Sequence, residues 1–427
     1  MSFDVAIVGA GLAGCEAAWQ CAKRGAKVGL YEMKPTKRSP AHHSDRFCEL
    51  VCSNSFRAEG LQNAIGLLKE ELLRCGSLVM SCAMKHKVPA GGALAVDREG
   101  FSEAVTREIR SHPNITVIEQ EITSLEFDIP AVIAAGPLAS EGLSEAICRF
   151  FGEKQLFFFD AAAPIVTAES IDMSKAYLAS RYQKGTADYI NCPMNEDEYK
   201  AFYDSLIGAQ TAHIHEFDTD RVFEGCMPVE VMAKRGYETL LYGPLKPVGL
   251  PDPHTGKLPR GVVQLRKDNA ASSLYNIVGF QTHLTFPEQK RVFSMIPGLE
   301  NAEFVRYGVM HRNTFLNSPC LLTPTYETRK KKGLFFAGQI TGVEGYIESV
   351  SSGFVAGLNA LGKSVEFPRE TAIGALAHYV SDPGSEPFQP MNINFGLFPS
   401  LEGKIKKKDR KLQLSQRALN ILATIKL

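Results

Sequence analysis

Three glycines near the start of the chain have the spacing of a dinucleotide-binding fingerprint. Gly9, Gly11 and Gly14 follow an apolar run at residues 3–8, which is typical of a buried parallel strand. The first glycine of such a loop permits a tight turn, the second lets the backbone approach a pyrophosphate, and the third lets the next helix lie close to the sheet. The spacing therefore predicts a phosphate cradle made of Gly9, Ala10, Gly11, Leu12, Ala13 and Gly14.

An acidic residue follows at the distance that this kind of site requires. Glu32 ends a second apolar segment, residues 27–31, and lies 18 residues after Gly14. We expect a helix to begin near Leu12, so that its free N–H groups point at the phosphates, while Glu32 accepts hydrogen bonds from a ribose hydroxyl. These features predict an adenine dinucleotide site and leave FAD and NAD open.

Two cysteine segments could carry reactive thiols. Cys52 precedes apolar residues at helical spacing over 61–73, so we expect it near a helix N-terminus, whose amides would stabilise a thiolate or bind an anion. Cys226 lies between Gly225 and Pro228, which favours a tight turn. A buried, unreactive core cysteine is the alternative at Cys226.

Length and composition restrict the classes of protein to which this chain can belong. A chain of 427 residues predicts about two domains. Its 47 Lys and Arg balance 47 Asp and Glu, which argues against a protein that coats nucleic acid through bulk charge. The start of the sequence lacks an export signal, and no apolar stretch approaches the roughly 18 residues of a membrane span. We therefore expect a cytoplasmic protein, not attached to a membrane, with free thiols.

The order of predicted elements indicates an α/β fold: a Rossmann-type FAD-binding domain with a parallel sheet, interrupted by an inserted α+β domain. Short alternating strands and prolines distinguish the middle of the chain from both ends. We predict a first part of the FAD-binding domain over 1–167, an inserted α+β substrate domain over 168–324, and a return segment with a basic C-terminal helix over 325–427.

Two later strands end in glycine turns that could approach the same cofactor. The segment 131–134 runs into Gly136, and the buried segment 333–338 ends at Gly338 and Gln339. A small-residue helix follows Gln339. This late return favours FAD, because a long cofactor can contact two separated segments of one chain.

The combined motifs closely resemble those of the bacterial folate- and FAD-dependent tRNA uracil-5-methyltransferases. The resemblance runs from the N-terminus to the tail, and its cysteine motifs are more specific than the glycine fingerprint. The Ala-Gly-Gln segment is shared with the related flavoenzymes that modify the tRNA wobble uridine. The motifs are Gly9-Ala-Gly-Leu-Ala-Gly14, Glu49-Leu-Val-Cys-Ser-Asn-Ser-Phe-Arg57, Phe223-Glu-Gly-Cys-Met-Pro-Val-Glu230, Phe335-Phe-Ala-Gly-Gln-Ile-Thr-Gly-Val-Glu-Gly-Tyr346 and Phe388-Gln-Pro-Met-Asn-Ile-Asn-Phe-Gly396.

The resemblance implies a reaction, namely methylation of the T-loop uridine of tRNA to 5-methyluridine. It implies 5,10-methylenetetrahydrofolate as carbon donor, with FAD reduced by NAD(P)H as reductant. By matching motifs, Cys226 resembles the nucleophile that adds to C6 of uracil, and Cys52 its partner in proton removal or adduct resolution. The two roles could be exchanged. The resemblance implies no obligate protein partner.

Several alternatives stay open. The same chemistry could act on ribosomal RNA, the chain could be a small-molecule oxidoreductase with Cys52 as a redox thiol, or it could be a noncatalytic FAD-bound RNA-binding module. Cys48, His42 and His43 lie near Cys52, but no second ligand pair with zinc spacing exists, so we expect no metal site. Candidate substrate and phosphate contacts are His283, Arg306, Arg312, the tail segment 404–411 and the basic run 330–332.

Overall fold

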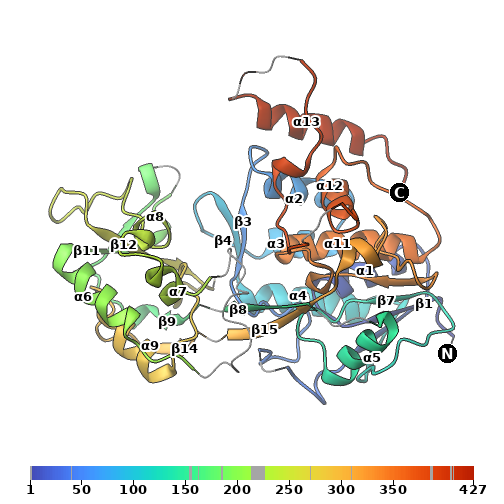
Figure 1. The fold of residues 1–427 in the computed structure, drawn as a ribbon, viewed down its shortest axis with the longest axis horizontal. Coiled ribbons are helices and arrows are strands. Elements are labelled where there is room, and N and C mark those ends of the chain that lie inside the picture. Colours follow the sequence, from blue (N-terminus) through green and yellow to red (C-terminus); the bar gives the residue numbers. More distant parts are fainter. Residues whose placement is uncertain are drawn as a thin grey trace.

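The computed structural model confirms the α/β class. It describes residues 2–39, 41–152, 156–161, 163–183, 186–212, 227–269, 271–308, 310–384, 388–403, 406 and 408–427, with backbone alone for 156–161 and 310–314. Two lobes lie side by side in Figure 1, one built from both ends of the chain and the other from its middle. No helix among these residues is long and apolar enough to cross a bilayer.

A five-stranded parallel sheet forms the centre of the first lobe. Its order is β16-β7-β1-β2-β6, so the last strand in sequence pairs with β7, and the return of the chain to this sheet is confirmed. The side chains of β1 are all buried, as expected for a strand covered on both faces. The strands are β1 (Val5–Val8), β2 (Val28–Glu32), β6 (Ile115–Glu119), β7 (Ala131–Ile133) and β16 (Leu334–Phe336).

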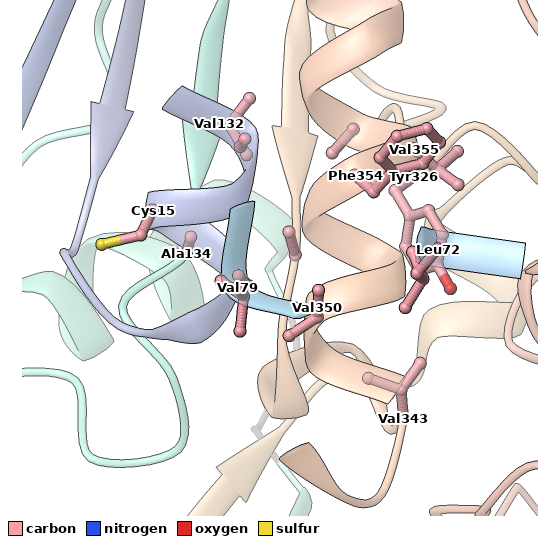
Figure 2. Packing of buried hydrophobic residues seen from close by; sticks show 14 of the residues in the cluster. Cys15, Leu72, Val79, Val132, Ala134, Tyr326, Val343, Val350, Phe354 and Val355 are labelled. Atoms are coloured by element: carbon pink, nitrogen blue, oxygen red, sulfur yellow. The ribbon is translucent and has the colours of Figure 1, made fainter. Parts of the chain in front are cut away.

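Two helices from opposite ends of the sequence pack together against this sheet. They are α1 (Leu12–Ala22) and α11 (Tyr346–Ala360). A Cβ at Gly353 would lie 2.1 Å from the carbonyl oxygen of Ala13, and one at Gly357 would lie 2.7 Å from the Cα of Ala17, so only glycine permits this crossing. On the far side of α11, Figure 2 shows Phe354 and Val355 gathered with other buried side chains.

Further helices complete the first lobe around this pair (Figure 1). A three-stranded antiparallel sheet, in the order β3-β5-β4, leads toward the second lobe. The helices are α2 (Ala64–Arg74), α3 (Leu78–Lys85), α4 (Arg98–Ser111), α5 (Glu141–Phe151), α10 (Ser318–Leu321), α12 (Ala372–Tyr379) and α13 (Arg410–Leu422), and the strands are β3 (Ser55–Ala58), β4 (Lys87–Val88) and β5 (Ala93–Val96).

The middle of the chain forms a second sheet with its own apolar core, which runs from Val166 to Ala302. The sheet has six strands in the order β10-β11-β12-β13-β9-β14, all antiparallel, and an antiparallel pair, β8 with β15, connects the lobes. The division of the chain at residues 167 and 324 stays a prediction. The strands are β8 (Leu156–Ala161), β9 (Ile165–Thr167), β10 (Tyr177–Ala179), β11 (Tyr189–Met194), β12 (Gly261–Lys267), β13 (Leu274–Ile277), β14 (Phe304–Arg306) and β15 (Met310–Phe315), and the helices are α6 (Glu196–Ile207), α7 (Val229–Lys234), α8 (Thr239–Tyr242) and α9 (Phe286–Phe293).

Candidate active site

A cleft lies at the carboxyl ends of β1, β2 and β7. It contains about 1120 Å³ of empty space, part of it open to solvent. Strand order reverses beside β1, with β2 on one side and β7 on the other, and doubly wound sheets bind ligands at such a point. The lining includes Gly9, Ala10, Gly11, Leu12, Ala13, Glu32, Cys48, Val51, Gly136, Gly338, Gln339 and Tyr346.

The glycines of the first loop differ in what a side chain would meet. At Gly9, with φ +98°, a Cβ would lie 2.7 Å from the carbonyl oxygen of Ala134, and at Gly14 it would lie 1.8 Å from the carbonyl oxygen of Gly9. The packing of the protein itself therefore requires glycine at these two positions. At Gly11 no atom of the described structure lies within 4 Å of the Cβ position. Gly11 lines the cleft, and the empty space beside it would let a ligand approach the protein backbone closely.

Helix α1 presents its N-terminus to the same space. Its N-cap is Gly11, and within the described structure it has neither a side-chain cap nor an acidic residue in its first turn. The positive end of the helix dipole is therefore left for an anionic ligand. Gly14, inside the helix, is one of its buried residues, as the fingerprint predicts.

Glu32 holds the glycine loop in place. One carboxylate oxygen accepts a hydrogen bond from Ala10 N at 2.7 Å, and the other accepts one from Lys34 N at 3.0 Å. Glu32 is 8% exposed and lines the cleft. Each carboxylate oxygen can accept a second hydrogen bond, and contact with a ribose hydroxyl remains a prediction.

The return segment also lines the cleft, where Gly338 lies beside Ala13 of α1. Gly136 has φ +69° and Gly338 has φ +86°, conformations that favour glycine. No described atom lies within 4 Å of a Cβ at Gly136, so this turn also leaves space. Gln339 donates from Nε2 to both carboxylate oxygens of Glu344, at 3.1 and 2.9 Å. The predicted second approach of the chain to the cleft is thus present.

The expectation that Cys52 lies near a helix N-terminus is wrong. Strand β3 intervenes, and α2 begins only at Ala64, with Asn63 as its N-cap. The reason is tertiary pairing, because Ser55 and Ala58 pair with β5, with a register shift between them where Arg57 has φ +63°. The dipole of α2 therefore does not stabilise a thiolate at Cys52.

Cationic side chains instead surround the Cys52 loop. Arg98 donates to the carbonyl of Leu50, and Arg306 donates to the carbonyl of Val51. Burial and the neighbouring Arg98 lower the pKa of Arg306, and a negative charge on Cys52 would oppose this lowering. Cys52 is thus within electrostatic range of two guanidinium groups, of which that of Arg98 is also paired with Asp268 at 2.9 Å.

Two further side chains fix the shape of the loop. The phenol oxygen of Tyr346 accepts hydrogen bonds from Cys52 N at 2.9 Å and Ser53 N at 3.2 Å. Arg266, from β12 of the second lobe, donates to Asn54 Oδ1 at 3.1 Å and to Ser53 Oγ at 2.7 Å. The loop is therefore held from both lobes.

Five other cysteines are buried and are poor nucleophiles. Burial raises the pKa of Cys21, Cys75 and Cys192 to about 12 and that of Cys82 to about 11. Burial also raises the pKa of Cys48, which lines the cleft, well above its ordinary value. A thiol with such a pKa stays protonated at neutral pH. Cys52 differs from them because it is partly exposed.

The second predicted cysteine, Cys226, lies outside the described residues, so its proximity to Cys52 stays a prediction. The described residues on either side of 213–226 are anchored to one segment of the second lobe. Ala212 N donates to the carbonyl of His283, and Val229 N donates to the carbonyl of Gln281, both at 2.8 Å.

The remaining residues predicted to contact substrate or phosphate are only partly described by the structure. His283 lies against Glu230, with 2.5 Å between Nδ1 and the carboxylate, so a structural partner accounts for its position. The side chain of Arg312 lies outside the described residues. Residues 404, 405 and 407 of the basic tail also lie outside them, and α13 after the tail packs Leu414 and Leu419 inward. No group of three or more His, Cys, Asp or Glu within the described part of the chain could hold a metal ion.

Sequence reasoning missed the side chains that position Cys52. Arg98, Arg266 and Tyr346 are far from it in sequence and reach it only in the folded chain. Tyr346 had a signal, because it ends the Gly-Val-Glu-Gly-Tyr motif that follows the returning strand. Its role could not be inferred from that position alone.

Comparison with known proteins identifies the family. A family model described as Glucose inhibited division protein A matches residues 4–368. A relative from Listeria monocytogenes serotype 4b (strain F2365), named Methylenetetrahydrofolate--tRNA-(uracil-5-)-methyltransferase TrmFO, is 58% identical over 431 residues, which cover 100% of this chain and 99% of the relative. A relative of the same name from Acetivibrio thermocellus is 61% identical over 422 residues, which cover 97% of each chain.

A solved structure supports the fold. The structure of Aquifex aeolicus GidA in the form II crystal has a TM-score of 0.69 at 18% sequence identity and covers 100% of this chain and 74% of that chain. At this identity the likeness establishes the fold alone. The full-length relatives, in contrast, confirm the resemblance found in the motifs, and the chain belongs to the methylenetetrahydrofolate--tRNA-(uracil-5-)-methyltransferase family.

Proposed function

We propose that this protein methylates C5 of the T-loop uridine in tRNA, with 5,10-methylenetetrahydrofolate as the carbon donor. Relatives that match the whole chain are named for methylenetetrahydrofolate, tRNA and uracil C5. The observation that carries the proposal is the position of Cys52, in a loop held by Tyr346 at the edge of a dinucleotide-type cleft. We further propose that the enzyme acts in the cytoplasm, and no protein partner is inferred.

FAD is the cofactor that the cleft fits best. The space beside Gly11 and Gly136 and the uncapped start of α1 suit a pyrophosphate, and the return segment suits a long cofactor. When bound and reduced by NAD(P)H, FAD would supply the hydride that turns a one-carbon unit into a methyl group. The residues proposed to hold it are Gly9, Ala10, Gly11, Leu12, Ala13, Gly14, Glu32, Gly136, Gly338 and Gln339.

The two motif cysteines would activate the uracil. C5 of uracil is a weak nucleophile, and a thiolate that bonds to C6 moves the C5–C6 electron pair toward C5. We assign that thiolate to Cys226, after which C5 attacks the one-carbon unit. Cys52 then accepts the C5 proton, and the electron pair left on C5 expels the carrier nitrogen from the one-carbon unit, which becomes a methylene group double-bonded to C5. A hydride added to that methylene would make the methyl group, move the electron pair of the double bond into the C5–C6 bond and expel the Cys226 thiolate from C6. The exchanged assignment predicts the same product.

The surroundings of Cys52 support its part in this reaction. A residue that removes a proton must be held within reach of it and be ionised beforehand. The hydrogen bonds from Cys52 N and Ser53 N to Tyr346 hold the loop, and the guanidinium groups of Arg98 and Arg306 lie close enough to interact with a negative charge on Cys52. The target uridine must leave its stack in the folded tRNA to reach this site.

The test is a reconstituted reaction. Pure protein is incubated with unmodified tRNA, methylenetetrahydrofolate and NAD(P)H, and the RNA is digested and analysed for 5-methyluridine. We expect Cys226→Ala and Cys52→Ala each to retain flavin and lose methyl transfer. An active double variant would refute the two-cysteine mechanism. Product in ribosomal RNA but not in tRNA would redirect the assignment of the substrate.

A further inference from the structure

Three aromatic rings of the second lobe form a face-to-face stack. Tyr307 stacks on Phe286 with ring centroids 4.8 Å apart and planes 17° apart, and on Phe304 at 5.3 Å and 10°. The other ring pairs formed by described residues have interplanar angles of 32° or more. Protein rings commonly meet edge to face or offset, so a parallel series of three distinguishes this site.

One end of the stack is open. Phe286, the first residue of α9, is 51% exposed. Strand β14 is an edge strand of the six-stranded sheet. The stack therefore presents an aromatic ring at the surface on an edge of the second lobe.

The stack is held rigidly by a buried glutamine. Gln289, fully buried on α9, donates from Nε2 to the carbonyls of Leu284 at 2.7 Å and Gly308 at 2.8 Å, and its Oε1 accepts from Gly308 N at 2.7 Å. These bonds tie the start of α9 to the residue after Tyr307. Because the chain is fixed next to Phe286 and next to Tyr307, little conformational entropy is lost when a flat ligand stacks on Phe286.

The residues of the stack are also neighbours in sequence of the residues that attach both cysteine segments. Arg306, which precedes Tyr307, donates to the carbonyl of Val51 beside Cys52. On the other side, Gln281 and His283, shortly before Phe286, accept the hydrogen bonds that anchor the chain on both sides of residues 213–226. A ligand on Phe286 would therefore bind a part of the chain whose sequence neighbours hold the Cys52 loop and the flanks of the Cys226 segment.

We propose that the exposed ring of Phe286 is a stacking platform for an unpaired nucleobase of the RNA substrate. This inference rests on the proposed function and adds a specific RNA contact to it. An RNA whose target uridine is extruded also exposes neighbouring bases, and single-stranded bases bind proteins largely by stacking on aromatic rings. Such a contact needs no net positive charge, which agrees with the balance of 47 basic and 47 acidic residues.

The test compares Phe286→Ala with Phe286→Trp, which keeps a ring. Phe286→Ala should raise the KM for tRNA at least fivefold, while flavin content and the KM values for methylenetetrahydrofolate and NAD(P)H stay at wild-type values. Phe286→Trp should restore the KM for tRNA, and its fluorescence should be quenched on addition of tRNA. The chain has one natural tryptophan, so the wild-type protein supplies the background. Tyr242→Ala, which removes an 83% exposed ring from the same lobe, is the matched control and should leave all KM values unchanged.

Other outcomes separate the platform from the proposed function. An unchanged KM for tRNA in Phe286→Ala overturns the platform, as does a raised KM for methylenetetrahydrofolate alone, which would assign the ring to a pterin. Absence of quenching in an active Phe286→Trp protein also overturns it. If the wild-type protein makes no 5-methyluridine, the proposed function fails. The platform is then tested separately by a direct binding titration, in which an unchanged affinity of Phe286→Ala for tRNA would refute it.

Discussion

The phenol oxygen of Tyr346 lies 2.9 Å from the backbone nitrogen of Cys52 and accepts its hydrogen bond. The same oxygen accepts from Ser53 N at 3.2 Å. Tyr346 begins α11, so the helix that packs on α1 also sets the position of the Cys52 loop. Burial raises the pKa of Tyr346 above its ordinary value, and the phenol therefore stays protonated. A substitution of Tyr346 can therefore alter the position of the Cys52 loop while the thiol itself is kept.

Tyr346→Phe should lower the rate of methyl transfer about tenfold. The substitution leaves two backbone N–H groups without their acceptor, and a buried unsatisfied donor costs about 1–3 kcal/mol. Single-turnover formation of 5-methyluridine measures the rate, and flavin absorbance checks that the cofactor is kept. Tyr379→Phe is the control, because its hydroxyl donates to the carbonyl of Gln389 and not to the Cys52 loop. Equal rates in Tyr346→Phe and wild type would show that the hydrogen bonds do not position Cys52.

Gly11→Val should produce a folded protein with little flavin. No described atom lies within 4 Å of a Cβ at Gly11, and its φ of −78° suits any residue, so the fold should tolerate the side chain. The valine would instead fill the space proposed for the pyrophosphate. Flavin content after purification measures the loss of cofactor, and the thermal midpoint of the apoprotein checks that the variant is folded. Gly92→Val is the matched control, since that position is equally open and should retain flavin. Full occupancy in Gly11→Val would contradict the proposed FAD site.

Arg266→Lys should slow methyl transfer about tenfold with flavin unchanged. Arg266 binds Asn54 and Ser53 through two nitrogens of one planar group, a geometry that lysine cannot reproduce. Hydrogen bonds to charged groups contribute about 1.5–3 kcal/mol, and their loss should loosen the loop from the second lobe. The ratio of turnover numbers is the readout. Arg110→Lys, in an exposed ion pair with Glu119, should have no effect.

The sequence was sufficient for the elements that carry local patterns. Continuous apolar runs located β1 and β2, and glycine spacing located the start of α1, because local sterics and burial determine these features. Strand β3 could not be predicted, since its four residues contain one fully buried side chain and are held by pairing with β5. Arg266 and Tyr346 could not be assigned to Cys52 either. Their contacts join residues more than 200 positions apart, and only the packed lobes bring them together.

Stability should depend on pH through Glu71. This carboxylate from α2 accepts hydrogen bonds from Ala372 N at 2.8 Å and Ile373 N at 2.9 Å, at the start of α12. Burial raises its pKa from 4.5 to about 7, although both hydrogen bonds act to lower it. The folded state therefore binds more protons than the unfolded state between these two pH values. The stabilising contribution is fully present below pH 4.5 and is lost as pH rises through about 7.

Glu71→Gln removes this titration, so the free energy of unfolding of the wild type relative to the variant should fall between pH 4.5 and about 7. The rise in the pKa of Glu71 corresponds to a fall of about 3 kcal/mol in this difference in free energy of unfolding, since one pKa unit is about 1.4 kcal/mol. Urea unfolding at a series of pH values measures the difference. Glu70→Gln is the control, because Glu70 is exposed in an ion pair with Arg74 and should show a difference that hardly changes with pH. A constant difference between wild type and Glu71→Gln would mean that Glu71 is ionised throughout this range in the folded protein, with the two α12 amides outweighing its burial.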